Sequence, residues 1–287
     1  MSQFKTNPER YLDRPTIDRI RKIADYHTAV GGVDHDNILT YAIGDIHGMD
    51  KYLLKMLEFM TRCAKESPEI RNLPSRFVFL GDYVDRGTGI AESLAMVRLL
   101  QEMMPAGQVV ALRGNHEEML LADYVDDSDG PSFFREESSN GRSFTRCGQG
   151  LEIPADLIFW LARLPYKFET KAQVFVHAGL DPRFKIHQQN KATMIWIRGE
   201  FLESDHDFGK RVVHGHTPSL NGVEHEAFRT NLDTGACFGG PLSGALFDPN
   251  TNNPLSFYLV TENVKRKLQL RGGDKYIIEI DEKKEIK

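Results

Sequence analysis

The sequence predicts an α/β fold, because a short apolar strand, a polar loop and a helical pattern follow one another three times in its first half. The strands are expected at 38–42, 77–80 and 109–112. A glycine follows each strand, and carboxylate, amide or imidazole side chains come directly after it. This repetition predicts a largely parallel sheet with a functional site at the carboxyl ends of its strands.

The loops after these strands carry three motifs. The first reads Gly-Asp-Ile-His-Gly at 44–48, the second Gly-Asp-Tyr-Val-Asp-Arg-Gly at 81–87, and the third Gly-Asn-His-Glu at 114–117. Apolar residues recur at helical spacing after each loop, so three helices are expected. Their predicted ranges are 50–60, 90–103 and 117–124.

The second half is expected to be richer in hairpins. A proline in the first turn predicts a short helix over 154–164. Strands at 173–176 and 211–213 end in histidine-containing loops, His177-Ala178-Gly179 and His214-Gly215-His216. Further short strands, interpreted as antiparallel, are expected at 228–232, 244–248, 255–261, 267–270 and 275–280.

Two other segments stand apart from this pattern. Residues 16–23 have the apolar spacing of an amphipathic helix, which is expected to pack on the outside of the domain. Residues 126–150 are rich in Asp, Ser, Gly and Arg, and we interpret them as a wall of a substrate cleft in preference to a flexible insertion.

Composition narrows the class of protein. A formal net charge of -5 argues against nucleic acid or an anionic membrane surface as the main partner. No apolar run approaches the roughly 20 residues of a membrane helix, and the first ten residues lack the apolar core of a signal peptide. We therefore expect a soluble, cytoplasmic protein.

The cysteines exclude one type of phosphate chemistry. Cys63, Cys147 and Cys237 are too few and too scattered for a disulfide framework, so they are expected to be reduced. A cysteine-dependent phosphatase needs an arginine six positions after its thiolate. Glutamate, isoleucine and serine occupy those positions here, so this chemistry is excluded.

The strand-end loops supply three oxygen and three imidazole donors from five segments of the chain. These are Asp45, His47, Asp82, Asn115, His177 and His216. Oxygen and imidazole without thiolate suit manganese, iron or zinc, and six donors are too many for one ion with an open position. Asp82, in the central loop, is expected to bridge two ions, with the donors of the first loop on one side and the remaining three on the other. Two cations roughly 3.5 to 4 Å apart activate a bridging water, which predicts direct hydrolysis without a phosphoenzyme.

Other residues of the loops are assigned to proton transfer and to phosphate. His116 is expected to protonate the departing alkoxide, oriented by Asp85. Arg86 can bind two phosphate oxygens. Arg198, alone in an apolar stretch, is also assigned to phosphate, with an ion pair to Glu200 or Glu203 as the alternative. Asn115 is assigned to both metal and phosphate.

Taken in this order, the motifs over about 39–217 resemble the phosphoprotein phosphatase superfamily of metallophosphoesterases. The resemblance implies a four-layer sandwich, with two mixed sheets between helices. It also implies hydrolysis of phosphoserine and phosphothreonine in proteins by two metal ions, with manganese expected before iron or zinc. The segments His214-Gly215-His216-Thr217 and 196–201 are more similar to bacterial members. The family's ligand aligns with His216, so His214 is expected beside the metal ligands or on the phosphate side.

Three parts of the chain are expected, and more than one function agrees with the motifs. A partly helical extension is expected at 1–36, the catalytic domain at 37–262, and a hairpin with a charged tail at 263–287. Phosphotyrosine is an additional candidate substrate. The alternatives are a diadenosine tetraphosphate hydrolase and a non-catalytic scaffold that binds phosphoproteins. Asp85 favours the protein phosphatases, and the intact donor set argues against the scaffold.

Overall fold

Two β-sheets face each other in the computed structural model, which describes residues 7–29, 37–125, 153, 155–271 and 274–276. Sheet A comprises β1 (Leu39–Ile43), β2 (Ser75–Phe79), β3 (Val109–Ala111), β9 (Leu242–Phe247), β10 (Pro254–Val260), β11 (Lys265–Arg271) and β12 (Asp274–Tyr276). Their spatial order is β12-β11-β10-β9-β1-β2-β3. Strands β1, β2 and β3 are parallel, whereas β9 to β12 are antiparallel to their neighbours.

The three strands expected to be parallel are parallel, and the C-terminal strands expected to be antiparallel make sheet A mixed. Short loops join β9 to β10 and β10 to β11, and a short loop can connect only antiparallel strands. The two mixed sheets implied by the family resemblance are confirmed. The expected C-terminal hairpin is formed by β11 and β12, and β11 pairs with β10, so the hairpin extends sheet A.

Sheet B comprises β4 (Lys167–Glu169), β5 (Gln173–Val176), β6 (Arg211–His214), β7 (Glu224–His225) and β8 (Arg229–Asn231). Their spatial order is β4-β5-β6-β8-β7. Strands β5, β6 and β8 are parallel, and the short edge strands β4 and β7 are antiparallel. The interpretation of 228–232 as an antiparallel strand was thus incomplete, because β8 runs parallel to β6.

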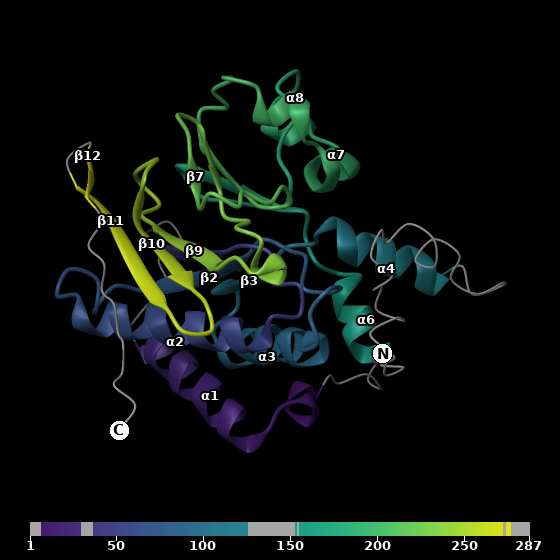
Figure 1. Ribbon diagram of the computed structural model, residues 1–287, viewed down its shortest axis with the longest axis vertical. Helices are drawn as coiled ribbons and strands as arrows, with labels where there is room; N and C mark the ends of the chain where they lie inside the picture. Colours follow the sequence, from purple (N-terminus) through teal and green to yellow (C-terminus); the bar gives the residue numbers. More distant parts are fainter. Residues whose placement is uncertain (1–6, 30–36, 126–152, 154, 272–273, 277–287) are drawn as a thin grey trace.

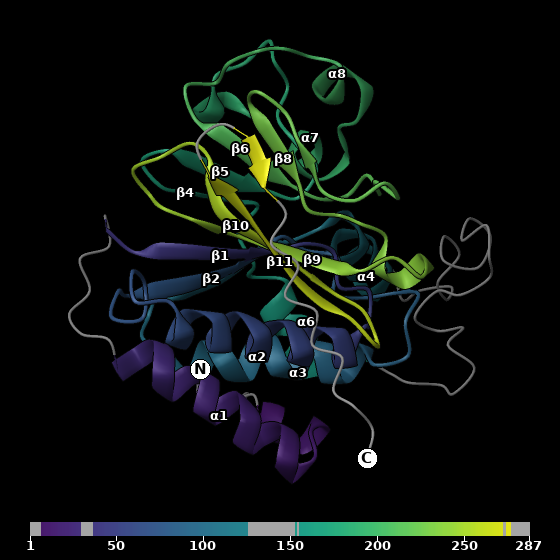
Figure 2. The same ribbon diagram turned by 60° about the vertical axis from the view of Figure 1, so that its left-hand side comes forward.

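Helices cover the outer faces of both sheets. They are α1 (Arg14–Ala29), α2 (Asp50–Glu66), α3 (Ile90–Met103), α4 (Asn115–Val125), α6 (Ala155–Leu161), α7 (Lys191–Trp196) and α8 (Gly199–Leu202), with 3-10 turns η1 (Pro8–Tyr11), η3 (Ile186–Gln188) and η4 (Ala236–Phe238). Figures 1 and 2 show α2 and α3 beneath sheet A, α1 outside them, and α7 and α8 beyond sheet B. The layers therefore run helix, sheet, sheet, helix.

Alternation of side chains along the strands produces this layering. Tyr41 of β1 is buried against the helices below sheet A, whereas its neighbour Ala42 is buried between the two sheets. In β5, Phe175 fills the space between the sheets and Val174 packs under α7 and α8. Because successive residues of a strand point to opposite faces, a strand between two layers must be apolar on both.

Several expected features lie at the margins of the fold. The amphipathic helix near the N-terminus is α1, whose Ile20 and Ile23 are buried in the layer below sheet A. Cys63 and Cys237 form no disulfide bond with another described residue. The segment 126–150 and Cys147 lie outside the described residues. No helix in the described part of the chain is both long and apolar enough to cross a membrane.

Candidate active site

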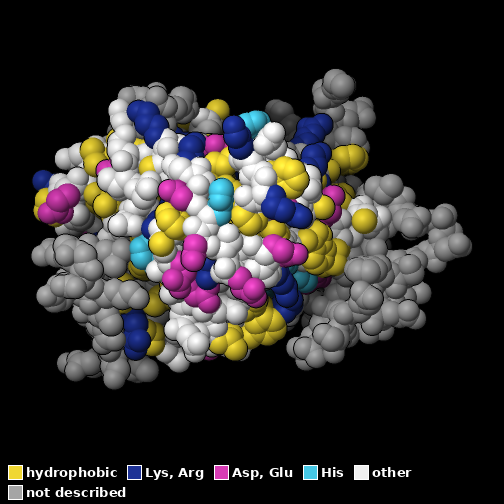
Figure 3. All heavy atoms as spheres, turned by 90° about the horizontal axis from the view of Figure 1, so that it is seen from above, with side chains coloured by type: hydrophobic (Ala, Val, Ile, Leu, Met, Phe, Trp, Pro, Cys, Tyr) yellow, Lys and Arg dark blue, Asp and Glu magenta, His cyan; other side chains and the backbone are white. Residues whose placement is uncertain are grey.

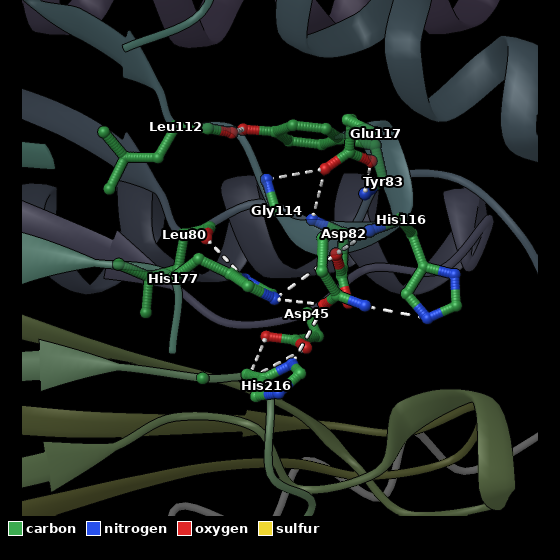
Figure 4. A network of polar contacts seen from close by, with 12 residues as sticks. Asp45, Leu80, Asp82, Tyr83, Leu112, Gly114, His116, Glu117, His177 and His216 are labelled. Atoms are coloured by element: carbon green, nitrogen blue, oxygen red, sulfur yellow. Dashed lines mark hydrogen bonds and ion pairs between the residues drawn. The ribbon is translucent and has the colours of Figure 1, made fainter. Parts of the chain in front are cut away.

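The six expected donors come together because two sets of parallel strands end at the same place. The loops after β1, β2 and β3 meet the loops after β5 and β6, as Figure 4 shows around Asp82. Backbone bonds fix the first two loops to each other, since the N–H groups of Ile46 and His47 donate to the carbonyl oxygen of Asp82 at 3.1 and 2.8 Å. Helix α4 begins at Asn115, so Asn115 and His116 occupy its first turn.

Asp82 lies at the centre of the donors. Its Oδ1 is 3.3 Å from His177 Nε2, and its Oδ2 is 3.5 Å from His47 Nε2. Asn115 Oδ1 is 2.9 Å from both His177 Nε2 and His216 Nδ1. Two groups of donor atoms, each within 4.8 Å of one another, share Asp82: His47, Asp82 and His116, and Asp82, His177 and His216. This arrangement is the one expected of a carboxylate between two ions.

Asp45 lies in the site, where its carboxylate contacts the loop after β6. Its carboxylate accepts the backbone N–H of His216 at 3.1 and 3.2 Å, and only 3% of the residue is exposed. Among the described residues, Asp45 belongs to neither compact donor group. The structure therefore places its carboxylate against the loop after β6, and its expected pairing with His47 on one ion stays a prediction.

Two histidines are oriented as metal ligands by backbone carbonyl groups. His47 Nδ1 is 2.7 Å from the carbonyl oxygen of Val84, and His177 Nδ1 is 3.0 Å from that of Leu80. A carbonyl oxygen only accepts, so each Nδ1 carries the proton and each Nε2 presents its lone pair toward Asp82. Neutral imidazole in this tautomer is the form that binds a divalent cation.

Backbone strain is concentrated at the same site. Among the described residues, the non-glycine residues with positive φ are His47, Asp82, Asp85, Arg86 and His216. Such conformations cost of order 1–3 kcal/mol each and persist where the surrounding structure enforces them. The strained residues are all expected site residues, which supports a functional role for these loops independently of their motifs.

Close backbone approach explains two of the glycines. A β-carbon on Gly114 would lie 2.1 Å from Asp82 Oδ1, and one on Gly81 would lie 2.6 Å from the backbone nitrogen of Gly114. Gly81 also has a φ of 106°, which other residues rarely adopt. Only glycine lets the second and third loops approach so closely.

Glu117 holds those two loops together, a role that the sequence did not reveal. Its Oε1 accepts the N–H groups of Tyr83 and Val84 at 2.7 and 3.2 Å, and its Oε2 accepts those of Asp82 and Gly114 at 2.8 and 2.9 Å. Burial and the charge of Asp82 raise the pKa of Glu117 to about 7. Four N–H donors leave no acceptor position for a proton, however, and therefore favour the carboxylate.

Excess negative charge makes the buried centre suitable for cations. Burial and the nearby Asp233 carboxylate raise the pKa of Asp45 well above its usual range. Burial alone would lower the pKa of His177, but the charges of Asp82 and Asp45 raise it to about 10. The carboxylates of this site therefore favour a bound positive charge, whether a proton or a metal ion. The oxygen and imidazole donors, without thiolate, fit divalent manganese, iron or zinc.

His116 and Asp85 form the expected pair. His116 Nδ1 is 2.5 Å from Asp85 Oδ2, and its Nε2 is 3.9 Å from Asp82 Oδ2. Burial lowers the pKa of His116, but the charge of Asp82 and the bond to Asp85 overcome this effect and raise it. His116 is therefore favoured in the protonated form, with Nε2 directed toward the donors.

The two expected phosphate arginines also reach the centre. Arg86 Nη2 is 3.5 Å from His116 Nε2, and its guanidinium lies 4.6 Å from the ring centre of Phe238. Arg198 Nε donates to His216 Nε2 at 3.0 Å. The structure thus directs Arg198 toward the donors, and its alternative partners Glu200 and Glu203 make no ion pair with it among the described residues.

His214 does not join the donors. It is fully buried, its ring packs edge-on against Phe201 at 5.0 Å, and its Nδ1 is 3.1 Å from the carbonyl oxygen of Gly215. The ring of His216, in contrast, lies beside those of His177 and Trp196. This geometry agrees with the choice of His216 over His214 as a ligand.

Asp233 is a further buried carboxylate that the sequence reasoning missed. It follows β8, whose carboxyl end lies at the same edge as those of β5 and β6. Burial, together with the charge of Asp82, raises the pKa of Asp233 to about 6. A signal was present, since Asp-Thr-Gly follows an expected strand there, but the strand had been interpreted as antiparallel.

A small cavity of about 160 Å³ lies elsewhere, between the loop after α8 and the start of β8. Its lining includes Phe201, Phe208 and Phe228 together with Glu203 and Asp205. Figure 3 looks onto the end of the molecule that carries α7 and α8, where acidic side chains gather. None of the donors lines this cavity, so it is separate from the candidate active site.

The sequence of this chain is similar to those of known phosphoesterases. The calcineurin-like phosphoesterase family model matches residues 38–241. A symmetrical bis(5'-nucleosyl)-tetraphosphatase of Sodalis glossinidius is 33% identical over 207 residues, which cover 68% of this chain and 64% of that protein. The serine/threonine-protein phosphatase SIT4 of Candida albicans is 39% identical over 74 residues, covering 26% and 22%.

A solved structure shares the fold at lower sequence identity. The crystal structure of a putative diadenosine tetraphosphatase superposes with a TM-score of 0.54 at 20% identity, covering 80% of this chain and 96% of that one. The chain spans only 45% and 64% of the length of two tetraphosphatases that it matches. The family match covers well over half of the chain and contains all the donor loops. This protein therefore belongs to the calcineurin-like phosphoesterases, a family of metallophosphoesterases.

Proposed function

We propose that this protein hydrolyses phosphoserine and phosphothreonine in proteins as a metal-dependent phosphomonoesterase. The observation that carries the proposal is the bond of 2.5 Å between His116 Nδ1 and Asp85 Oδ2. It leaves Nε2 of His116 directed toward the donors, where a leaving oxygen would be protonated. The pair is useful only for a substrate whose leaving group needs a proton.

The leaving groups of the competing substrates differ in this requirement. A serine or threonine alkoxide is strongly basic, so a general acid lowers the barrier to its departure. The nucleotide released from a dinucleoside tetraphosphate departs as a weakly basic phosphate, which gains little from protonation. An oriented, protonated His116 therefore favours phosphomonoesters of serine and threonine.

The other residues would bind the metals and position the phosphate. Asp45, His47, Asp82, Asn115, His177 and His216 would hold two divalent cations, with manganese expected first. Bound cations supply activation of a water nucleophile and neutralise charge on the phosphoryl oxygens. Arg86 and Arg198 would bind the remaining phosphate oxygens, and Asn115 lies where it can serve metal and phosphate together.

A dinucleoside tetraphosphate hydrolase is the second candidate. It is favoured by the printed function of the relatives, since symmetrical tetraphosphatases match this chain at 33% identity. Both activities require the same donor set. The second candidate gives no account of the bond between Asp85 and His116.

A direct comparison of substrates tests the proposal. The purified protein is supplied with Mn²⁺ and assayed side by side on phosphoserine and phosphothreonine peptides, a phosphotyrosine peptide and diadenosine tetraphosphate. We expect the phosphoserine and phosphothreonine peptides to have the higher kcat/KM. Cleavage of the dinucleotide alone would establish the second candidate. Failure to cleave any of them with metal bound would favour a phosphoprotein-binding scaffold.

A further inference from the structure

Asp233 occupies a position in the fold equivalent to those of the expected ligands. Strands β5, β6 and β8 are parallel neighbours, and the loops after the first two supply His177 and His216. Asp233 is in the loop after the third, two residues beyond the end of β8. The residue is 4% exposed. A carboxylate at this depth needs a compensating positive charge.

The loop around Asp233 fixes the position of its carboxylate. Asp233 Oδ1 accepts the N–H of Gly235 at 3.0 Å, and its backbone carbonyl accepts the N–H of Ser219 at 2.9 Å. Its own N–H donates to Asn231 Oδ1 at 3.0 Å. Among the described residues, Asp233 forms no ion pair with Lys or Arg. Its charge therefore has no direct partner within that part of the chain.

Asp233 lies beside Asp45 at the edge of the donor groups. The point that a β-carbon on Gly215 would occupy is 2.0 Å from Asp45 Oδ1 and 3.6 Å from the β-carbon of Asp233. Two acidic residues so near the same point repel each other when both are charged in a buried site. A cation held by Asp45 would be close to both.

Asp233 adds a fourth buried carboxylate to those around the donors. Four buried carboxylates surround the donors and are not committed to a protein cation: Asp45, Asp82, Glu117 and Asp233. Asp85, by contrast, is bonded to His116. Two divalent cations carry four positive charges, which these four carboxylates balance. Arg86 and Arg198 are then free to compensate a phosphate dianion.

We propose that Asp233 raises the affinity of the metal centre for its cations. Asp233 is in neither compact donor group, but its negative charge helps to retain the divalent cation that Asp45 would bind. Asp233 is thus a positioning residue that acts through Asp45 on the cations. The inference depends on metal binding at this centre and is independent of which phosphoester is the substrate.

The test removes the negative charge of Asp233 while keeping the shape of its side chain. In Asp233→Asn, the side-chain oxygen can still accept the N–H of Gly235, but the charge is lost. Mn²⁺ binding to the chelator-treated protein is measured by titration calorimetry, and bound metal is counted after gel filtration. We expect affinity to fall roughly 10- to 100-fold, as for other residues that support metal ligands, and stoichiometry to fall toward one.

Controls separate charge from shape. Asp233→Glu keeps the charge and should recover most of the affinity. Asp156→Asn removes a buried carboxylate that is bonded to Arg10 and belongs to neither donor group, so it should leave the Mn²⁺ affinity unchanged. If the Asn variant does not fold, Asp233→Ser removes the same charge and keeps a hydroxyl acceptor. Wild-type affinity in the charge-deleted variant would overturn the proposal. Equal losses in the Asn and Glu variants would also overturn it, because shape alone would then be responsible.

Discussion

Glu117→Gln is the substitution whose effect the structure defines most closely. The carboxylate accepts four buried backbone N–H groups, two on each oxygen. An amide has one oxygen and one NH₂ group, so two of the four N–H groups would face a donor. Leaving a buried donor without an acceptor costs about 1–3 kcal/mol, which gives about 2–6 kcal/mol for the pair. Since whole domains are stable by only about 5–15 kcal/mol, this is a severe loss.

Denaturant unfolding measures the loss of stability in Glu117→Gln, and Mn²⁺ titration shows whether the metal site is affected. We expect the free energy of unfolding to fall by at least about 2 kcal/mol, and Mn²⁺ affinity to fall with it, because Glu117 holds the loop that carries Asp82 against the loop that carries Asn115. Glu118→Gln is the matched control on the same helix, since Glu118 is half-exposed and contacts Arg113 and Tyr166. A Glu117→Gln protein as stable as the control, with wild-type metal affinity, would refute the reasoning.

Three further predictions concern the centre itself. Asp82→Asn should lose at least one equivalent of bound metal by elemental analysis, because Asp82 is shared by both donor groups; retention of two equivalents would exclude a bridging role. His116→Asn should keep its metal, yet lose roughly 10²- to 10⁴-fold in kcat on phosphoserine peptide and much less on p-nitrophenyl phosphate, whose leaving group is weakly basic. Equal losses on both substrates would exclude His116 as the acid. The charge of Asp82 and the bond to Asp85 raise the pKa of His116, so Asp85→Asn should lower that pKa and move the alkaline limb of the kcat profile on phosphopeptide to lower pH. If the limb does not move, His116 is not the group that titrates there.

The local elements could be read from the sequence because their causes are local. Helix α3 spans Ile90–Met103, the range that apolar spacing and the following Pro-Ala-Gly stop predicted. The strands before the three motifs were found for the same reason, since the alternation of buried side chains is written into consecutive residues. The direction of β8 was missed, because pairing with β6 depends on residues far away in the chain.

The identity of the donors could also be predicted from the sequence, but their arrangement in space could not. The strand-end motifs were sufficient to propose the donors, His116, Asp85 and Arg86, whereas Arg198 was proposed from its place in an apolar stretch and His216 was preferred to His214 from the family resemblance. They did not show that Asp45 faces the loop of His216, or that Glu117 binds four N–H groups from two loops. Those facts depend on which backbone groups meet across the space between the sheets.

The sequence alone therefore determined the chemistry available to this protein, because residue types and the strand ends that carry them are fixed along the chain. The tertiary structure decided how that chemistry is arranged. It brought Asp233 to the ligand edge by making β8 parallel to β6, and it strained five site residues into positive φ. The physical reason is that charge balance and backbone strain arise from contacts between segments that share no local pattern.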